Sequence, residues 1–433
     1  MKTNVSANME KELEQYFDRL WPICRSITGN GVRESLSILS EIAPMTTHEV
    51  ATGTRVLDWT VPKEWNIKEA YIITPEGKKI ADMSLNNLHV VSYSTPIQAA
   101  LSWEELAPHL HTLPSMPDAI PYITSYYKEQ WGFCLTHHEW EALPREGTYQ
   151  VVIQSTLENG SLTYGEAILP GESEKEILFS TYVCHPSMAN NELSGPLAQA
   201  FLYRAIAAMP HRKYTYRFVF IPETIGAIAC LAEHGNSWKT NLLAGYVLTC
   251  VGDDGQFHYK RSRRGNALVD QITEHILKHY APYALIQDFI PNGSDERQYC
   301  SPGFNLPVGS LMRTPYYQYP YYHTSLDNKE FISFDALAGT VHMYAKLVEA
   351  LELNGHYFNT EPYGEPQLGK RNLYPQTISA EYKRDYLDTM LYLINFSDGV
   401  HTLLDIAEKR GKPIFDFAEP LKNCMDAGLI IRQ

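Results

Sequence analysis

The sequence predicts an α/β protein with a doubly wound, mostly parallel sheet, a small β-rich insert and a C-terminal winged-helix domain. Between residues 149 and 353, short apolar runs alternate with stretches of helical periodicity, as in parallel sheets flanked by helices. Short strands and turns fill the insert, and the last part of the chain has the helix, helix, helix, strand order of a winged helix. We expect the α/β domain to comprise residues 1–45 and 115–355, the insert 46–114, and the winged helix 376–433.

Length and composition limit the class of protein. A chain of 433 residues is too long for one ordinary core, and 44% hydrophobic with 20% charged residues is typical of a folded globular protein. The N-terminal residues carry charges where a signal peptide has an apolar core, and no apolar run is long enough to span a bilayer, so we expect a cytoplasmic protein. Seven cysteines without a Cys-x-x-Cys pair favour free thiols. A net charge of −14 disfavours nucleic acid and anionic membranes as partners.

The N-terminal part contains two predicted helices and then the strands of the insert. Leu13, Phe17 and Leu20 recur on one helical face, and a second helix is expected from Val32 to Ile42 after the turn sequence Thr-Gly-Asn-Gly. In the insert, strands are expected in the segments TRVLDW, EAYIIT, KIADM and LHVVSY.

The α/β domain resumes near Tyr149 with an expected hairpin that turns at Asn159-Gly160. Buried strands are expected in ILFSTYV, YRFVFI, GYVLTCV and LPVGSLMRT, and helices over 196–209, 225–234, 267–280 and 334–353. A Pro/Gly-rich bridge, 355–375, leads to a helix over 380–395. From residue 381 on, the chain has seven Lys and Arg and nine Asp and Glu. The tail is therefore slightly acidic and resembles a packing or protein-partner domain more than a DNA-binding one.

Three groups suited to metal chemistry follow predicted strands. His185 comes just after the strand that begins at Ile177, where open α/β sheets place their ligands, and Asn191 and Glu192 follow six and seven residues later. Glu223 follows the next apolar run, and His323 ends a tyrosine-rich run. The order of these motifs is far more specific than any one of them.

Together the motifs resemble the zinc aminopeptidase family, which includes bacterial leucyl aminopeptidases, glutamate carboxypeptidase and the single-zinc glutaminyl cyclases. The segments DWTVPKEW, NNLHVVSYSTP, CHPSMANNELSG and GSDERQYCSPGF are similar to those of bacterial aminopeptidase-like proteins, often encoded with polysaccharide-biosynthesis genes, that carry an inserted domain and a winged-helix tail. The resemblance covers nearly the whole chain and implies the fold predicted above.

A hydrolytic zinc site needs about three protein ligands, and two imidazoles with one carboxylate form a common set. His185 and His323 supply the imidazoles, and Glu192 is the nearest carboxylate. Asn191 aligns better with the family's bridging aspartate, but zinc prefers an anionic oxygen, which favours Glu192. The remaining positive charge would lower the pKa of a bound water towards about 7. In the family, the glutamate at the position of Glu223 is the general base.

The chain departs from the family at three acidic ligand positions. The family has a bridging Asp where this chain has Asn191, an acidic ligand where it has Thr224, and an Asp where it has Cys250. Because three anionic donors are missing, we expect one zinc per chain.

Four further residues are candidates for the site. Asp327 is placed to hydrogen-bond His323 and hold its tautomer. Asp295 lies on the loop where cyclases carry a catalytic Asp, and Tyr322 and Arg297 are candidate substrate-binding residues. Each has a structural alternative: Asp295 as an ion-pair partner of Arg297, Asp327 as a turn cap, and the tyrosines as packing residues. Two similar alternatives apply to residues named above: Glu223 as a helix N-terminal carboxylate, and Asn191 and Glu192 as helix caps.

The sequence thus predicts a mononuclear zinc hydrolase, aminopeptidase-like, that cleaves an amide bond in a small peptide or an aminoacyl or N-acyl conjugate. Acyl transfer or cyclisation on the same zinc is the alternative among enzymes. A non-catalytic scaffold that recruits a protein partner through its winged helix is the alternative of another class. A homo-oligomer is compatible with each of them.

Overall fold

The computed structural model describes residues 2–374 and 380–432. The chain forms two compact units. One comprises Met1–Val269 with Leu285–Met343, and the other Asp270–Ala284 with Tyr344–Gln433. Helices α7 (Leu268–Tyr280) and α9 (Phe334–Leu353) have residues in both units.

An eight-stranded sheet forms the centre of the first unit, in the order β1-β10-β12-β11-β13-β16-β14-β15. The middle strand β11 (Ser173–Tyr182) runs parallel to β12 (Tyr214–Ile221) and to β13 (Leu242–Val247), and β13 runs parallel to β16 (Val308–Met312). The four therefore end at the same edge. The outer strands are β1 (Thr46–Ala51), β10 (Ser161–Leu169), β14 (His258–Lys260) and β15 (Leu285–Gln287). The mostly parallel sheet is confirmed.

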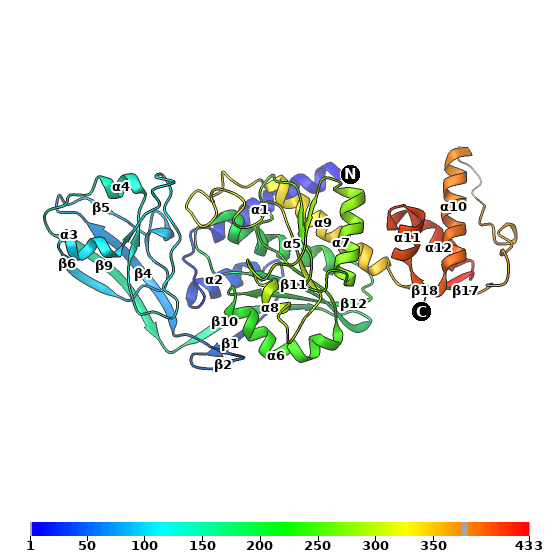
Figure 1. Ribbon diagram of the computed structural model, residues 1–433, viewed down its shortest axis with the longest axis horizontal. Helices are drawn as coiled ribbons and strands as arrows, with labels where there is room; N and C mark the ends of the chain where they lie inside the picture. Colours follow the sequence, from blue (N-terminus) through cyan, green and yellow to red (C-terminus); the bar gives the residue numbers. More distant parts are fainter. Residues whose placement is uncertain (1, 375–379, 433) are drawn as a thin grey trace. The chain divides into compact units, whose positions relative to one another are not determined.

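Helices cover both faces of this sheet, as a doubly wound fold requires (Figure 1). α5 (Ser194–Ala207) and α6 (Ile225–Asn241) both pack against β11. Apolar side chains of the strands, among them Leu178, Val219 and Val247, are fully buried in one core with α6 residues. The other helices here are α1 (Lys2–Leu20), α2 (Asn30–Leu39) and α8 (Glu296–Tyr299).

The insert has its own sheet, in the order β5-β4-β9-β6, and its own apolar core. Its strands are β4 (Glu64–Ile73), β5 (Lys79–Ile80), β6 (Ile97–Leu101) and β9 (Tyr149–Glu158). Smaller elements are β2 (Arg55–Val56), β3 (Trp59–Thr60), β7 (Leu110–His111), β8 (Phe133–Cys134), α3 (Trp103–Leu106) and α4 (His137–Glu141). The expected bounds 46–114 differ at both ends, because β1 pairs within the large sheet, while residues up to β9 complete the insert.

The hairpin expected across Asn159-Gly160 does not form, and that prediction is wrong. β9 pairs with β4 and β6, whereas β10 pairs with β1 and β12. The turn residues instead carry the chain from one sheet to the other. A local Asn-Gly signal indicates a change of direction but not which strands pair, and the ten-residue β4 offers β9 a longer partner than β10 does.

The second unit contains the winged helix. Its three-stranded sheet has the order β18-β17-β19, with β17 (His356–Asn359), β18 (Asp398–Thr402) and β19 (Ile430–Arg432). The helices are α10 (Ala380–Phe396), α11 (Leu403–Arg410) and α12 (Ala418–Asp426). The winged-helix architecture is confirmed, but its sheet begins at β17, inside the expected bridge. The expected first residue of the domain, 376, lies outside the described residues.

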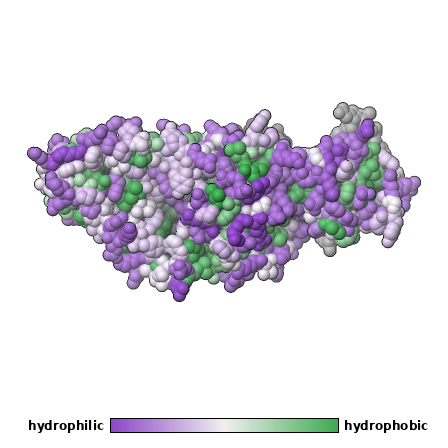
Figure 2. Space-filling model, in the orientation of Figure 1, coloured by the Kyte–Doolittle hydropathy of each residue, from purple (hydrophilic) through white to green (hydrophobic). Residues whose placement is uncertain are grey.

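The surface is largely hydrophilic, and hydrophobic residues on the visible face form small separate patches (Figure 2). In the part of the chain that the structure describes, every helix is too short or too polar to cross a bilayer.

Candidate active site

Groups from three strand ends converge at the carboxyl edge of the large sheet. His185 follows β11, Glu223 follows β12, and His323 lies in the loop after β16. The imidazole centroids of His185 and His323 are 5.4 Å apart, and His185 Nε2 is 3.4 Å from Glu223 Oε2. The fold thus brings together three of the predicted site residues that are far apart in sequence.

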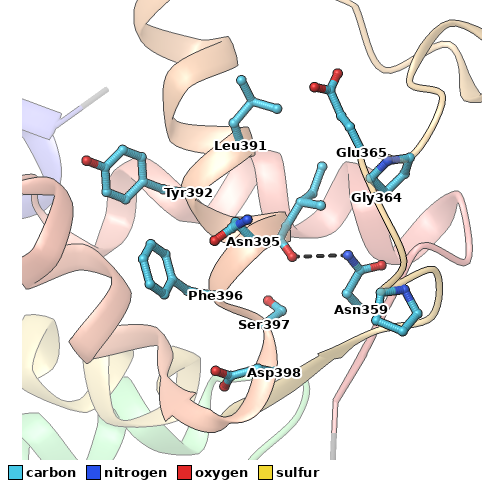
Figure 3. Close-up of a pocket in the computed structure, with 12 residues that line it drawn as sticks. Asn359, Gly364, Glu365, Leu391, Tyr392, Asn395, Phe396, Ser397 and Asp398 are labelled. Carbon is cyan, nitrogen blue, oxygen red and sulfur yellow. Dashed lines mark hydrogen bonds between the residues drawn. The ribbon is translucent and has the colours of Figure 1, made fainter.

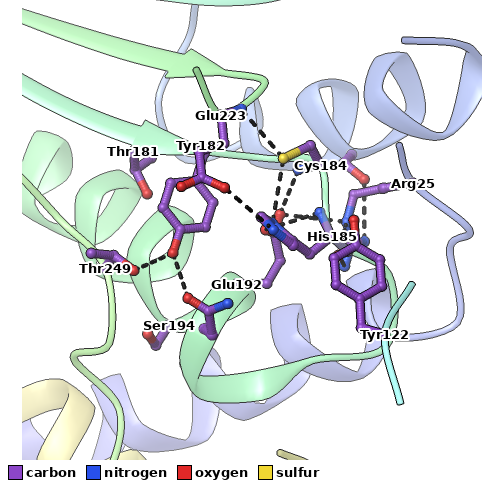
Figure 4. A network of polar contacts seen from close by, with 12 residues as sticks. Arg25, Tyr122, Thr181, Tyr182, Cys184, His185, Glu192, Ser194, Glu223 and Thr249 are labelled. Carbon is purple, nitrogen blue, oxygen red and sulfur yellow. Dashed lines mark hydrogen bonds and ion pairs between the residues drawn. The ribbon is translucent and has the colours of Figure 1, made fainter. Parts of the chain in front are cut away.

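His185 is held in place on its other side by a buried network (Figure 4). Glu192 Oε2 lies 2.9 Å from His185 Nδ1, and the same carboxylate accepts the backbone N–H groups of Cys184 and His185 at 2.8 and 3.0 Å. Arg25, fully buried, donates to the carbonyl of His185 at 3.2 Å and lies 3.8 Å from Glu192 Oε1. With Nδ1 bonded to Glu192, the Nε2 atom faces Glu223 and the cavity.

The position of Glu192 therefore differs from the one that its predicted role as third metal ligand requires. Its oxygens already face three nitrogen donors on the Nδ1 side of His185, away from His323. Asn191, the alternative ligand, accepts the hydroxyl of Tyr182 at 2.6 Å through Oδ1. Cys184, His185 and Glu192 do present ligand atoms within 4.8 Å of one another, but their mutual hydrogen bonds account for that cluster.

His323 differs from His185 in having a free ring nitrogen. Its buried Nε2 has no hydrogen-bond partner among residues 2–374 and 380–432. Burial and the nearby His185 lower the pKa of His323 to about 3, so its imidazole is neutral at ordinary pH. The backbone adopts φ +58°, a left-handed conformation that is strained for a histidine. Tyr322 stacks on the ring with centroids 4.0 Å apart.

Asp327 contacts the chain around Asn191 and not His323. Its carboxylate accepts the backbone N–H groups of Asn190 and Asn191 at 2.6 and 2.9 Å and the hydroxyl of Tyr319 at 2.9 Å. These bonds hold the π-helical turn Ala189–Leu193 that places Glu192. The expected contact with His323 is absent from the described hydrogen bonds.

Asp295 and Arg297 meet at Thr224, next to Glu223. Asp295 Oδ1 accepts the Thr224 N–H at 2.7 Å, and Arg297 donates to Thr224 Oγ1 at 3.1 Å. Burial and the neighbouring Glu223 raise the pKa of Asp295 well above its ordinary value. Burial also raises the pKa of Glu223, against the effect of His185. The two carboxyl groups thus share one desolvated region, in which the charged form of each is disfavoured by burial.

A cavity of about 270 Å³ opens onto His185 and Glu223. Its aromatic wall comes from the insert, as Trp59, Tyr126 and Tyr127 line it. Tyr122, also outside the predicted site, lies 5.1 Å from the ring of His185 and 5.3 Å from that of His323. Trp59 belongs to the segment DWTVPKEW, which indicated only the family resemblance, and the three tyrosines stand in no quoted segment.

Neutral groups occupy the positions where the family has extra acidic ligands. Asn191 Oδ1 accepts from Tyr182 and lies 3.7 Å from the thiol of Cys250. Tyr182 also contacts Thr249 Oγ1. Burial raises the pKa of Cys250 far above its ordinary value, so its thiol is uncharged.

The donors at the open face suit zinc. His323 offers a neutral, buried and unpartnered nitrogen, and His185 Nε2 faces the carboxylate of Glu223, a place that stabilises positive charge. Two imidazole nitrogens are donors that zinc accepts, and the carboxylate of Glu223 lies beside them. The residues present therefore fit a zinc ion.

The fold and these residues define the class as aminopeptidase-like α/β proteins. A zinc aminopeptidase from Bacillus subtilis matches with a TM-score of 0.57 at 12% identity, covering 80% of this chain and 94% of that one. A peptidase M28 precursor from Shewanella amazonensis matches with a TM-score of 0.52 at 10% identity, covering 80% and 95%. At these identities the similarity shows the fold, which is that of peptidases.

The chain belongs to the family described as "Domain of unknown function (DUF4910)", which matches residues 14–354, and a winged helix-turn-helix family matches residues 355–432. A Clostridium acetobutylicum protein, provisionally named as a polysaccharide biosynthesis protein with an aminopeptidase-like domain, is 49% identical over 401 residues, 92% of this chain and 91% of its own. A crystal structure of a provisionally named peptidase from the same species has a TM-score of 0.92 and 45% identity, covering 99% and 97%.

The winged-helix unit has a separate cavity of about 720 Å³ (Figure 3). It is lined by the end of α10 and the loop after β17, and of its lining residues only Glu365 and Asp398 are charged. Elsewhere in this unit, His275 Nδ1 bonds Glu408 and its Nε2 accepts the Ile414 N–H at 2.9 Å. Both ring nitrogens of His275 are used, so this histidine offers none to a metal.

Proposed function

We propose that this protein is a single-zinc amide hydrolase that acts on a small peptide or on an aminoacyl or N-acyl conjugate. The observation that carries the proposal is the Nε2 atom of His323, which is neutral, buried and without a partner among the described residues. The ring of His323 lies 5.4 Å from that of His185, whose own Nε2 faces Glu223. A buried polar atom without a partner destabilises the fold by about 1–3 kcal/mol unless a ligand satisfies it.

His185 and His323 would hold the zinc, with Glu223 on the same face. A zinc ion there would act as a Lewis acid that polarises the substrate carbonyl and activates water. Glu223 is one-quarter exposed to the cavity, so it can accept the proton of the attacking water and pass it to the leaving amine. Glu192 holds the ring of His185 in the tautomer that leaves Nε2 free. Asp295 positions Thr224 beside Glu223 through the Thr224 N–H.

One zinc per chain follows from the neutral cluster of Tyr182, Asn191 and Cys250. A second divalent cation would have to be held by an amide, a thiol and a phenol that already bond one another. None of these groups carries the negative charge that the family's second site has.

Metal analysis after dialysis against zinc tests the proposal. We expect about one zinc per chain, lost in His323→Ala and kept in His138→Ala, whose imidazole is 60% exposed. Zinc-free wild-type protein would overturn the proposal and favour the scaffold alternative.

Turnover of short peptides and N-acyl amino acids then tests the chemistry. Glu223→Gln should keep zinc and lose about 10²–10⁴-fold in kcat, because it removes the proton acceptor. Loss of zinc in this variant would make Glu223 a ligand. Products formed without uptake of water would favour acyl transfer or cyclisation.

The winged-helix unit is proposed as a binding site for a protein partner. The acidic lining of its cavity favours a protein over a nucleic acid backbone. Seven free cysteines support a reducing compartment such as the cytoplasm. Salt-dependent binding of a DNA duplex would contradict the assignment of the unit.

A further inference from the structure

Arg297 brings a positive charge into the cavity in front of His185. It is the only lysine or arginine among the described residues that line this cavity, and its guanidinium donates to Thr224 Oγ1 at 3.1 Å. Within residues 2–374 and 380–432, the guanidinium has no carboxylate oxygen in ion-pair range. Since arginine carries five N–H donors in a planar fork, most of its capacity for a planar anion is unused.

The neighbouring acids form no direct ion pair with Arg297 in the described part of the chain, although its charge acts on Glu223 and Asp295 at longer range. Glu223 is the only acidic residue in the lining, and its Oε2 lies at His185 Nε2. Asp295 is fully buried and turns one oxygen to the backbone of Thr224 instead of pairing with Arg297, as the sequence had allowed. The cavity lining thus has one carboxyl group at the reacting end and one guanidinium without a carboxylate in direct contact.

The remaining lining is apolar and partly exposed. Trp59 is 40% and Tyr127 is 52% exposed, and their rings meet edge to face with centroids 5.8 Å apart. Ile27 and Ile225 complete the apolar lining. Large aromatic rings left in contact with solvent inside a cavity are suited to cover an apolar group of a ligand.

We propose that the substrate carries a carboxylate that Arg297 binds, next to an apolar side chain that packs on Trp59 and Tyr127. The substrate class is therefore N-acyl amino acids, including dipeptides, with an apolar C-terminal residue. This rests on the proposed function for its hydrolytic part, but recognition of the carboxylate does not depend on turnover. An aminopeptidase that selects for a free α-ammonium group would need an unpaired acid where this cavity has an arginine.

A matched pair of substrates tests the proposal. Alanyl-phenylalanine and alanyl-phenylalaninamide share the scissile bond and the apolar side chain but differ in the carboxylate. We expect the wild-type zinc protein to prefer the free acid by about 10–100-fold in kcat/KM, because a charge-assisted bidentate pair forms only with the acid. Arg297→Gln should bring the ratio of kcat/KM for acid and amide near one, whatever its absolute rate. Arg297→Lys should retain part of the preference.

The control variant is Arg264→Gln. Arg264 is an exposed arginine that donates to the carbonyl of Asn305, outside the cavity. It should keep the wild-type preference. An unchanged ratio in Arg297→Gln, or a wild-type preference for the amide, would overturn the proposal.

Binding separates this inference from the hydrolytic one. Titration calorimetry with N-acetylphenylalanine and N-acetylphenylalaninamide needs no turnover, so it decides the matter even if neither dipeptide is cleaved. The wild type should bind the acid about 10-fold or more tightly than the amide, and Arg297→Gln should bind both equally, with circular dichroism as the check on folding. Equal affinities in the wild type, or no heat with millimolar acid, would refute the role of Arg297.

Discussion

The two histidines of the site are held in opposite ways. His185 is bonded at Nδ1 by Glu192, at its N–H by the same carboxylate and at its carbonyl by Arg25. His323 has a free Nε2 and a left-handed backbone conformation. One histidine is oriented by the fold itself, whereas the other is arranged as if a bound cation were to complete it. The fold therefore stabilises His185 through hydrogen bonds, whereas the unpartnered nitrogen and the backbone conformation of His323 lower the stability of the fold.

The largest expected effect is on the buried support of His185. Arg25→Met removes the buried positive charge beside Glu192 and the donor to the His185 carbonyl, which should lower the free energy of unfolding by about 3–5 kcal/mol in urea titrations. Arg19→Met is the matched control, because the Arg19–Glu41 pair is nearly half exposed and solvent screens its attraction, so its loss should change the stability little. Similar losses of unfolding free energy in both variants would show that burial of the ion pair does not determine its contribution to stability.

The same substitution at the two histidines should have unequal effects in zinc-free protein. His185→Phe removes the partner of Glu192 and should cost about 2–4 kcal/mol. His323→Phe replaces an unpaired buried nitrogen by carbon of similar shape, so its unfolding free energy should stay within about 1 kcal/mol of the wild type. Chemical unfolding with a chelator present gives both values. A larger loss at His323 would contradict the comparison.

Zinc should add stability only where His323 is intact. A ligand that binds only the folded state adds about 2.7 kcal/mol to the free energy of unfolding when its concentration is about 100 times its Kd. We expect an increase of this size in the wild type, its reversal by a chelator, and no increase in His323→Phe. Thermal unfolding with and without zinc measures it. Equal stabilisation of both proteins would place the ion elsewhere.

The smallest effect concerns a partly buried polar pair, in contrast to the fully buried one at His185. The Arg33 guanidinium lowers the pKa of Glu64 to about 2, and their atoms lie 2.8 Å apart where the insert meets α2. A depressed carboxyl pKa adds stability above the unfolded value of about 4.5, and this stability is lost as the pH falls towards 2. Glu64→Gln should cost about 1 kcal/mol at pH 7 and reduce the slope of stability between pH 4.5 and 2. An unchanged acid slope would show that Glu64 titrates normally.

Much of the fold was readable from local patterns. Helix α9 matches its predicted bounds, Phe334–Leu353, because apolar periodicity over twenty residues has few alternatives. The strands around Leu178 and Val219 were equally clear, because buried parallel strands are continuously apolar. The β9–β10 hairpin failed because strand pairing is a long-range choice.

The site could be predicted only in part. His185, Glu223 and His323 were identified by position after strands, and the structure brings them together. Glu192 was predicted as the third metal ligand, but which ring nitrogen of His185 it faces depends on the π-helical turn that Asp327 holds. The aromatic wall from Trp59 and Tyr127 was missed, since the segment DWTVPKEW that contains Trp59 indicated only a family resemblance and Tyr127 stands in no quoted segment.

By itself, the sequence determined the classes of secondary structure and the order along the chain of the strands that end at the site. It also identified the candidate groups for metal or acid–base chemistry. These are local properties, set by hydrophobic periodicity and side-chain chemistry. Only the tertiary structure decided which sheet β9 joins, which face of His185 meets a carboxylate, and which cation in the cavity lacks a carboxylate in direct contact. Those outcomes depend on atoms that are distant along the chain and become neighbours when the core excludes water, because desolvation makes each buried donor and charge seek a specific partner.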